Sequence, residues 1–374
     1  MINSWLYIDL AAFLVVLGLT GFIIPQILLI AFRKKLFDEI DPRKIHKSTV
    51  PRLGGIAFFP SILFAVLLAW GVGIRFAPEI LRDGLQSRPE GFCFIGCSVI
   101  ILYLVGMADD LVGVKYRAKF MAQFLSALLL IVGDLQLTGL HGFLGIHGMP
   151  SSVSVCLTIL LVVYVTNSIN LIDGIDGLAS GLSAVACAFY GVVFFRHGLQ
   201  LYGMLSFATL GALVPFFCYN VFGNSKKHTK IFMGDTGALT VGLILGVLCI
   251  RVCRMEDSVC GPNMAAVAFA PLLIPCFDVV RVYLHRLKEH RNPFMPDKCH
   301  IHHKLLALGL SQRAAMMSII ATALLLTVVN YLASIWMDIT LLFLLDLAFW
   351  IVGNILLTKV IRGRKIKIKE LESI

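Results

Sequence analysis

Charged residues are scarce in this sequence. Of its 374 residues, 14% are Asp, Glu, Lys or Arg and 58% are hydrophobic, and the mean hydropathy is +0.88. Soluble domains carry about 25% charged residues, so the composition excludes an ordinary water-soluble protein. Zinc-type spacings are also missing. The ten cysteines include no CxxC pair, which favours small apolar core residues over metal ligands.

Basic residues are absent before the first apolar run, Met1 to Ile30, and Arg33-Lys-Lys35 follow it. A signal peptide has the opposite order, so a membrane helix is predicted here. Further apolar runs of about 20 residues, long enough to cross a bilayer, continue along the chain. They predict one all-α polytopic membrane domain over residues 1–374 with about eleven transmembrane helices. The runs lie at roughly 5–32, 54–74, 92–108, 118–133 (the shortest and weakest), 152–170, 179–195, 200–222, 237–252, 264–284, 314–336 and 339–358.

Lys and Arg are unevenly distributed between the connections. With the N-terminus placed outside, the inside connections and the tail hold 26 of the 32 Lys and Arg residues. The positive-inside rule therefore predicts an outside N-terminus and a cytoplasmic C-terminus. The basic tail, residues 359–374, is expected to attract anionic membrane lipid. It lacks interleaved aromatic residues, so no nucleic-acid partner is expected.

Five carboxylates fall on the inside ends of the predicted helices. Asp109 and Asp110 end the third run, Asp173 and Asp176 follow the fifth, and Asp235 opens the eighth. Three separated stretches of chain thus bring acids to one membrane face. We expect a single cytoplasmic site.

The stretch Asn167-Ser-Ile-Asn-Leu-Ile-Asp-Gly-Ile-Asp-Gly-Leu178 is the most polar of these turns. Asp173 and Asp176 are three residues apart and share a face on a helical turn. Such a turn between membrane helices is costly without a cation. A polar hairpin loop is the alternative, but a metal-assisted site is favoured, and Mg²⁺ prefers oxygen ligands and substrate phosphates.

Basic residues surround the acids. Lys47 and Arg52 lie in the first inside loop, and Pro51-Arg-Leu-Gly-Gly55 runs directly into a membrane helix. This favours a phosphate-binding turn over an ordinary positive-inside loop. Near the second acid pair, Lys115, Arg117 and Lys119 are candidates to anchor headgroups or to hold a lipid phosphate.

The longest inside loop carries His300, His302 and His303. Imidazoles suit zinc, but no fourth ligand at a zinc spacing stands out, so contacts with phosphate or sugar are favoured. Two acids lie deeper in the membrane. Asp278 is expected to pair with Arg281 at helix spacing, whereas Asp346 has no evident partner. A proton-path role for either acid stays open as the alternative.

Five motifs together carry a family resemblance: Pro51-Arg-Leu-Gly-Gly55, Gly106-Met-Ala-Asp-Asp-Leu111, the 167–178 stretch, Phe232-Met-Gly-Asp-Thr-Gly237 and His300-Ile-His-His303. In this order, within residues 43–310, the chain resembles the polyprenyl-phosphate N-acetylhexosamine-1-phosphate transferases, the superfamily of WecA, TagO and MraY. The His-Ile-His-His loop resembles the branch that uses UDP-N-acetylglucosamine (UDP-GlcNAc).

The resemblance implies a bacterial enzyme of the cytoplasmic (inner) membrane. It would transfer GlcNAc-1-phosphate from UDP-GlcNAc to a polyprenyl phosphate such as undecaprenyl phosphate, release UMP and start a cell-envelope glycan. By position in the motifs, Asp109 and Asp110 would handle the lipid phosphate, and Asn170 and Asp235 would bind Mg²⁺, with Mn²⁺ as a substitute. The remaining residues assigned by this reading are catalytic Asp173 and Asp176, which would shape the diphosphate site, and substrate-binding Lys47, Arg52, Lys115, Asn167, His300, His302 and His303.

Three other functions stay open at this point. A transporter would place ionisable groups near the bilayer midplane, often beside broken helices, whereas the acids here crowd one face. The same chemistry on another UDP-amino sugar is a second alternative. A regulatory protein with a decayed site is a third, although all five motifs are intact. The oligomeric state is also open, with a homodimer as one alternative.

Overall fold

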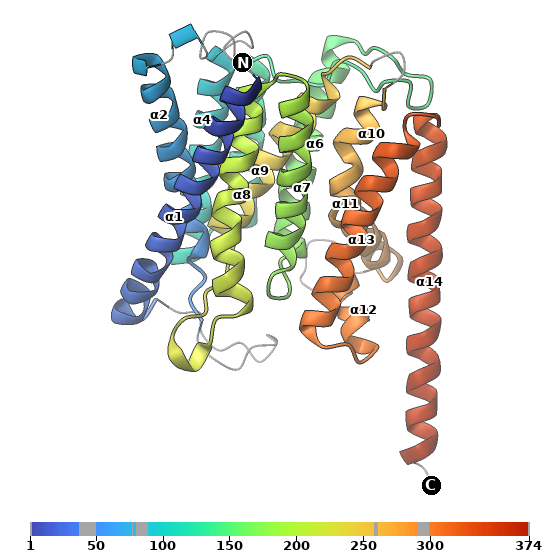
Figure 1. Ribbon diagram of the computed structural model, residues 1–374. Coiled ribbons are helices and arrows are strands. Elements are labelled where there is room, and N and C mark those ends of the chain that lie inside the picture. The colour runs from blue at the N-terminus through green and yellow to red at the C-terminus, as the bar shows by residue number, and fades with distance from the viewer. Residues whose placement is uncertain are drawn as a thin grey trace.

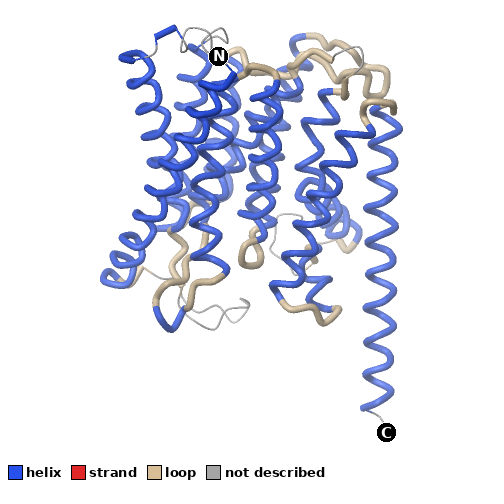
Figure 2. Tube along the Cα trace, viewed as in Figure 1, coloured by secondary structure: helices blue, strands red, loops and turns tan. Residues whose placement is uncertain are grey.

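The computed structural model describes residues 2–36, 50–76, 78–79, 89–257, 261–290 and 299–372. These residues form a bundle of helices without any β-strand (Figures 1 and 2). The fold class predicted from the sequence is confirmed. The helices are α1 (Ile2–Lys34), η1 (Gly54–Ala57), α2 (Phe58–Phe76), α4 (Pro89–Val112), α5 (Tyr116–Val132), α6 (Ser151–Ile172), α7 (Leu178–Arg196), α8 (Gln200–Val221), η2 (Ser225–Lys227), α9 (Gly234–Cys253), α10 (Met264–Phe269), η3 (Ala270–Leu272), α11 (Leu273–Lys288), α12 (Ile301–Ala307), α13 (Gln312–Ala333) and α14 (Ile339–Glu372).

Ten spans within the described residues are long and apolar enough to cross a membrane. The weakest predicted run became α5, a helix of 17 residues, which is about 25 Å long. The two ends of α5 lie beside α4 near the two ends of that helix. A Cβ added at Gly91 in α4 would lie 3.1 Å from the Gly133 oxygen just past α5, and Lys119 in α5 contacts Asp109 in α4. Because α5 runs antiparallel to α4 along its length, we count it as the eleventh crossing. The two chain ends accordingly lie on opposite faces (Figure 1).

Helix α9 occupies the centre of the bundle, and all of its residues except Asp235 and Arg251 are buried. Its beginning packs closely on the end of α4. A Cβ added at Gly106 would lie 2.6 Å from the Thr236 Cα atom, so only glycine permits this approach. In membranes, small residues let helix backbones come this close. The contact brings the acids at the end of α4 beside the acid at the beginning of α9.

The predicted run at 264–284 is not one continuous helix. It divides into α10, the 3₁₀ turn η3 and α11, with Pro271 inside the turn and Pro275 in the first turn of α11. Proline has no backbone N–H and clashes with the preceding turn of a helix, which explains the break. The broken segment forms one wall of the large cavity described below.

Candidate active site

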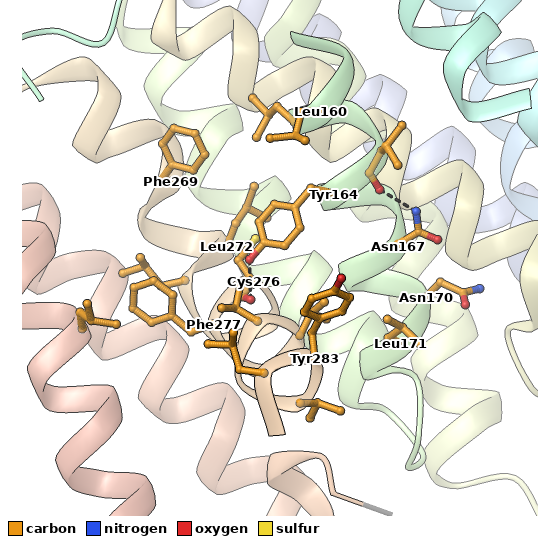
Figure 3. Close-up of a pocket in the computed structure, with 18 of the residues that line it drawn as sticks. Leu160, Tyr164, Asn167, Asn170, Leu171, Phe269, Leu272, Cys276, Phe277 and Tyr283 are labelled. Carbon is orange, nitrogen blue, oxygen red and sulfur yellow. Dashed lines mark hydrogen bonds between the residues drawn. The ribbon is translucent and has the colours of Figure 1, made fainter. Parts of the chain in front are cut away.

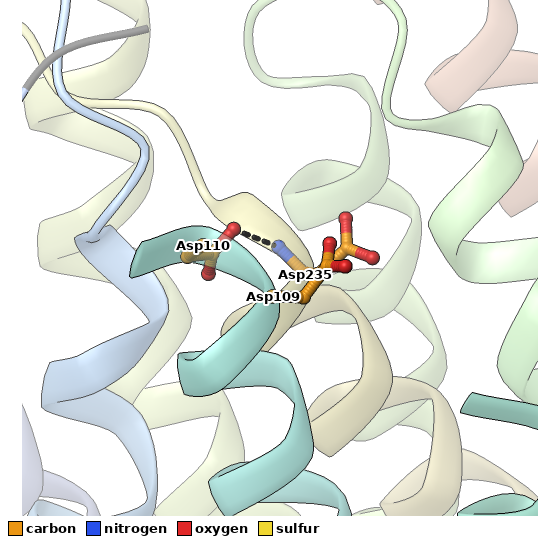
Figure 4. Close-up of side chains that lie close together, drawn as sticks. All are labelled: Asp109, Asp110 and Asp235. Atoms are coloured by element: carbon orange, nitrogen blue, oxygen red, sulfur yellow. Dashed lines mark hydrogen bonds between the residues drawn. The ribbon is translucent and has the colours of Figure 1, made fainter. Parts of the chain in front are cut away.

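Three carboxylates meet where α4 ends and α9 begins. One oxygen from each of Asp109, Asp110 and Asp235 lies within 4.8 Å of the others (Figure 4). The acids come from two motifs 125 residues apart, and the sequence had predicted their convergence on one face. Their roles differ, because their hydrogen-bond partners differ.

Asp110 fixes the beginning of α9. Its Oδ1 accepts from the Asp235 N–H (2.8 Å), and its Oδ2 accepts from the Thr236 N–H (2.8 Å) and hydroxyl (2.6 Å). The first amides of a helix have no partners within the helix, so a carboxylate here stabilises the helix N-terminus. Gly234 has a φ of +72°, and a Cβ there would collide with the Arg52 carbonyl oxygen and with Asp110. Asp110 therefore positions Asp235.

Lys119 joins the other two acids. Its Nζ lies 2.6 Å from the Asp235 Oδ2 and 3.1 Å from the Asp109 Oδ2. Asp109 also accepts from the Val114 N–H at 2.7 Å. The sequence had suggested Lys119 only as a residue that anchors a headgroup or lipid phosphate. Its pairing with Asp235, 116 residues away, depends on how α5 packs against α4 and α6, which no local pattern reveals.

The two asparagines of the 167–178 stretch are placed differently. Asn170 lies within hydrogen-bonding reach of the Asp235 carboxylate and lines the cavity beside it. Asn167 exchanges hydrogen bonds with Gln123 of α5: its Nδ2 donates to the Gln123 Oε1 (2.7 Å), and the Gln123 Nε2 donates to the Asn167 Oδ1 (3.3 Å). Asn167, predicted as a substrate-binding residue, thus joins α5 to α6. Gln123, an amide within an apolar run, was missed.

The turn after α6 places a second acid pair near the first. Burial raises the pKa of the Asp173 carboxyl to about 7; Arg52 lowers it, whereas Asp176, Asp235 and Asp110 add to the increase. The side chain nevertheless keeps a partial opening to solvent. Asp176 pairs with Lys230 at 2.5 Å.

The predicted loop is helical where it carries the histidines: His300 is the N-cap of α12, and His302 and His303 lie in its first turn. This segment, residues 299–303, is called the histidine loop below, and it is held by Asp278 of α11, which is fully buried. Asp278 accepts from the His300 Nδ1 (2.8 Å) and the Ile301 N–H (3.1 Å) as well as from Arg281 (2.7 Å). The predicted Asp278–Arg281 pair is confirmed, and it has a further partner in His300. Because a carboxylate only accepts, the His300 proton is held on Nδ1 and its Nε2 is left for other contacts.

His302 is 1% exposed, and neither of its ring nitrogens has a hydrogen-bond partner among the residues that the structure describes. Its ring packs on Gly174 so closely that an added Cβ there would collide with it. Burial lowers the pKa of His302 to about 3, assisted by the neighbouring His303 and His300, so the ring is neutral at physiological pH. The His303 ring lies 4.2 Å from that of His302. His302 therefore joins the histidine loop to the Asp173–Asp176 turn.

A cavity of about 1780 Å³ begins at these groups. Its polar end includes Lys119, Asn170, Asp235 and the three histidines, and the rest is lined mainly by apolar side chains of α6, α10, α11 and α14 (Figure 3). On α6 the lining extends from Cys156 to Asn170, which is about 21 Å of helix. The hydrocarbon core of a bilayer is about 30 Å thick, so the cavity follows much of its depth.

The remaining predicted residues lie around the cluster or outside it. Arg52 is an exposed side chain on the loop before η1 and acts electrostatically on Asp173. Lys115 is exposed at the N-cap of α5, one turn before Lys119. Lys47 lies outside the described residues. Asp346, which had no evident partner in the sequence, accepts from the Asn330 amide of α13 at 3.1 Å.

The donor set fits a hard divalent cation. Asp109 and Asp235 each present an oxygen toward the same point, and the Asn170 amide lies beside them. Carboxylate and amide oxygens suit Mg²⁺. The Lys119 ammonium contacts the Oδ2 atoms of Asp109 and Asp235. It therefore neutralises these two carboxylates as a bound cation would. Asp110 is less available, because both of its oxygens already accept from α9.

The chain is similar to a family of known proteins. The model of glycosyl transferase family 4 matches residues 92–253. A probable undecaprenyl-phosphate N-acetylglucosaminyl 1-phosphate transferase of Bacillus subtilis (strain 168) is 28% identical over 354 residues, covering 92% of this chain and 91% of the relative. The undecaprenyl-phosphate α-N-acetylglucosaminyl 1-phosphate transferase of Escherichia coli (strain K12) is 28% identical over 307 residues, covering 81% and 78%. A decaprenyl-phosphate N-acetylglucosaminephosphotransferase of Mycolicibacterium smegmatis is 30% identical over 298 residues, covering 74% and 70%.

The fold and the site define an integral membrane glycosyl-1-phosphate transferase, with an acidic cluster at the membrane face and an apolar cavity behind it. The five acids at the membrane face all lie within the matched residues, 92–253. The motifs at 51–55 and 300–303 lie outside this range. The chain belongs to glycosyl transferase family 4, the polyprenyl-phosphate sugar-1-phosphate transferases. The resemblance inferred from the five motifs is confirmed.

Proposed function

We propose that the protein transfers GlcNAc-1-phosphate from UDP-GlcNAc to a polyprenyl phosphate on the cytoplasmic face of a bacterial cytoplasmic membrane. A phosphate oxygen of the lipid attacks the β-phosphorus of the nucleotide, and the bond from that phosphorus to the bridging oxygen breaks. The products are polyprenyl-diphospho-GlcNAc and UMP. The names of the relatives support this donor and this type of acceptor.

The observation that carries the proposal is the junction of Lys119 with the apolar cavity. Lys119 lies between two acids at the polar end, and hydrocarbon-lined space begins directly beside it. A polyprenyl phosphate has this division into an anionic head and an apolar tail. Lys119 would bind the phosphate oxygens, and the tail would follow the cavity into the membrane.

The metal part of the proposal concerns Mg²⁺, with Mn²⁺ as a substitute. Asp235, Asp109 and Asn170 would hold it, and Asp110 would keep Asp235 in place. When bound, a divalent ion neutralises charge on the diphosphate and on the leaving phosphate. The chain's own contribution is to position the phosphates, with Arg52 and Lys230 near the second acid pair as candidates to face the nucleotide.

The acids, which lie at one membrane face rather than at the midplane, support a transferase over a transporter. The break at η3 adjoins the apolar cavity and carries no ionisable side chain. Another UDP-amino sugar stays the second candidate donor. The histidine loop favours GlcNAc only through the sequence resemblance.

The decisive experiment uses the purified protein with radiolabelled UDP-GlcNAc, undecaprenyl phosphate and Mg²⁺. Label should enter the organic phase with release of an equal amount of UMP. Solute flux through proteoliposomes without any such transfer would contradict the proposal.

Asp235→Asn tests the metal assignment in the same preparation. Loss of one charge-stabilising group should lower turnover by about two to three orders of magnitude. Mg²⁺ should also protect the wild-type protein against thermal unfolding at lower concentrations than it protects the variant. Asp134→Asn, at an acid that pairs with Arg254 and lies outside the cavity lining, is the matched control and should behave as wild type in both measurements. Equal protection of Asp235→Asn and wild type would move the metal to other acids.

A further inference from the structure

The end of the cavity remote from the acids is closed by a short segment between α5 and α6. We define residues 137–147 as the cap. Leu137, Leu140 and Phe143 of the cap line the cavity together with Ile339 and Phe343 of α14. The Phe143 and Phe343 rings meet edge to face with centroids 5.2 Å apart. The far wall of the cavity is therefore built of apolar side chains from the cap.

A histidine attaches the middle of the cap to the connection that follows α9. The His141 Nδ1 lies 2.8 Å from the Asp257 Oδ2, and its Nε2 lies 2.6 Å from the Cys253 carbonyl oxygen. Both ring nitrogens thus face oxygen atoms of the segment at the end of α9, so the ring joins the cap to that segment at two points. The His141 backbone oxygen also accepts from the Asn263 Nδ2 at 2.9 Å.

The cap backbone shows that its position is imposed by these contacts. His141 has a φ of 51° and Leu144 a φ of 52°, a region that costs free energy for residues other than glycine. Leu144 is also fixed at its backbone, because its N–H donates to the Thr340 Oγ1 at 2.9 Å. Such strain persists only where the surroundings hold the chain in place.

We propose that the cap is a specificity element for the acceptor: its apolar wall contacts the distal part of the lipid tail, and His141 holds that wall in position. This inference rests on the proposed function. Leu137 of the wall bonds to Thr158 and Ser154 at the beginning of α6, about 18 to 24 Å of helix from Asn170 beside the acids. When its phosphate is held at Lys119, only an acceptor with a long tail reaches the wall. The wall therefore favours acceptors with long tails over those with short tails.

The size of the effect follows from the environment that the tail leaves. A tail entering the cavity comes from lipid and not from water, so its gain is better packing rather than removal from water. Loss of one aromatic contact should then cost on the order of three- to tenfold in apparent affinity. The quantity to measure is the ratio of kcat/KM for undecaprenyl phosphate to kcat/KM for farnesyl phosphate, a short acceptor with the same head.

The wild-type protein should prefer the long acceptor, and both Phe143→Ala and His141→Ala should lower the ratio by about three- to tenfold. Phe143→Leu, a milder change, should lower it less and guards against misfolding of the first variant. His147→Ala is the matched control, because His147 is an exposed histidine of the same cap. It should leave the ratio unchanged.

The outcomes separate this inference from the proposed function. Failure of both acceptors in the wild-type protein would contradict the proposed function. If both acceptors react but the wild type does not distinguish them, or if Phe143→Ala lowers both values equally, the cap is only a structural cover and the inference is wrong.

Discussion

At the scale of single residues, the site depends on acids with unequal tasks. Asp235 and Asp109 share one ammonium group, whereas Asp110 is occupied by α9 and Asp278 by the histidine loop. The sequence shows a set of equivalent carboxylates near one face. Their partners, which lie on other helices, are what distinguish a ligand from a positioning residue.

Asp278 should act on the substrate only through His300, so Asp278→Asn should displace the His300 ring. The variant loses the charge that holds His300 and Arg281, so kcat/KM for UDP-GlcNAc should fall on the order of tenfold to a hundredfold, as expected for a displaced contact group. In the Asp278→Asn background, His300→Ala should add little, because the two residues act as one unit. Activities are compared per folded molecule, since an unpaired Arg281 also lowers stability. Fully additive effects of the two substitutions would contradict the positioning role.

His302 should make stability depend on pH in the acid range. The folded protein keeps the ring neutral down to about pH 3, whereas the unfolded chain binds a proton at about pH 6.5. The unfolded state therefore binds more protons between these values. Stability should fall as pH decreases through this window, by up to about 1.4 kcal/mol per pH unit.

The test compares urea unfolding of wild type, His302→Leu and His147→Leu in detergent from pH 7 to pH 4. His302→Leu should reduce the slope in this range, and the control at the exposed His147 should keep it. An unchanged slope in His302→Leu would mean that another group determines the acid sensitivity.

At the scale of the elements, the register between α5 and α6 is set by the Gln123–Asn167 pair. Gln123 is 1% exposed, and it lies one turn after Lys119, just as Asn170 lies one turn after Asn167. Gln123→Leu should therefore lower the free energy of unfolding by about 0.6 to 2 kcal/mol and raise the KM for the lipid acceptor. The double variant Gln123→Leu/Asn167→Leu should be less unstable than the sum of the single variants, because no lone amide is left buried. Strict additivity would show that the pair is not coupled.

The sequence predicted much of the helical framework because each apolar run can be recognised within one segment of the chain. It also predicted that five acids lie toward one face, because each lies at the end of such a run, and three of them, Asp109, Asp110 and Asp235, meet in the structure. It could not predict three of the side-chain contacts, because each joins helices or loops that are distant in the chain. These contacts are Lys119 with Asp235, Gln123 with Asn167, and His141 with Asp257. It missed the break at η3 because hydropathy does not register backbone geometry, although Pro271 and Pro275 were visible signals for it.

At the scale of the whole molecule, α14 extends beyond the bundle to Glu372, far past its last contact with the histidine loop (Figure 1). That contact is made by Lys304, whose Nζ donates to the Asn354 Oδ1 (3.0 Å) and the Thr358 hydroxyl (3.2 Å). Deleting residues 363–374 keeps both partners, so activity in detergent should stay close to wild type. In vesicles with anionic lipid the deletion should weaken surface attraction by about 1 kcal/mol per lost cation. Abolished activity in detergent would show that the tail acts at the site.

The shortness of α5 affects the membrane itself. A helix of about 25 Å stands in a hydrocarbon layer of about 30 Å, and such mismatch is relieved by local thinning of the bilayer or by extension of flanking side chains. Lys119 lies in the first turn of this helix, beside the acids. The headgroup plane should therefore dip toward Lys119, so a lipid phosphate descends to the carboxylates with little of its tail leaving the hydrocarbon. Membrane thickness then becomes a determinant of rate, and the protein should work faster in thinner bilayers than in thicker ones.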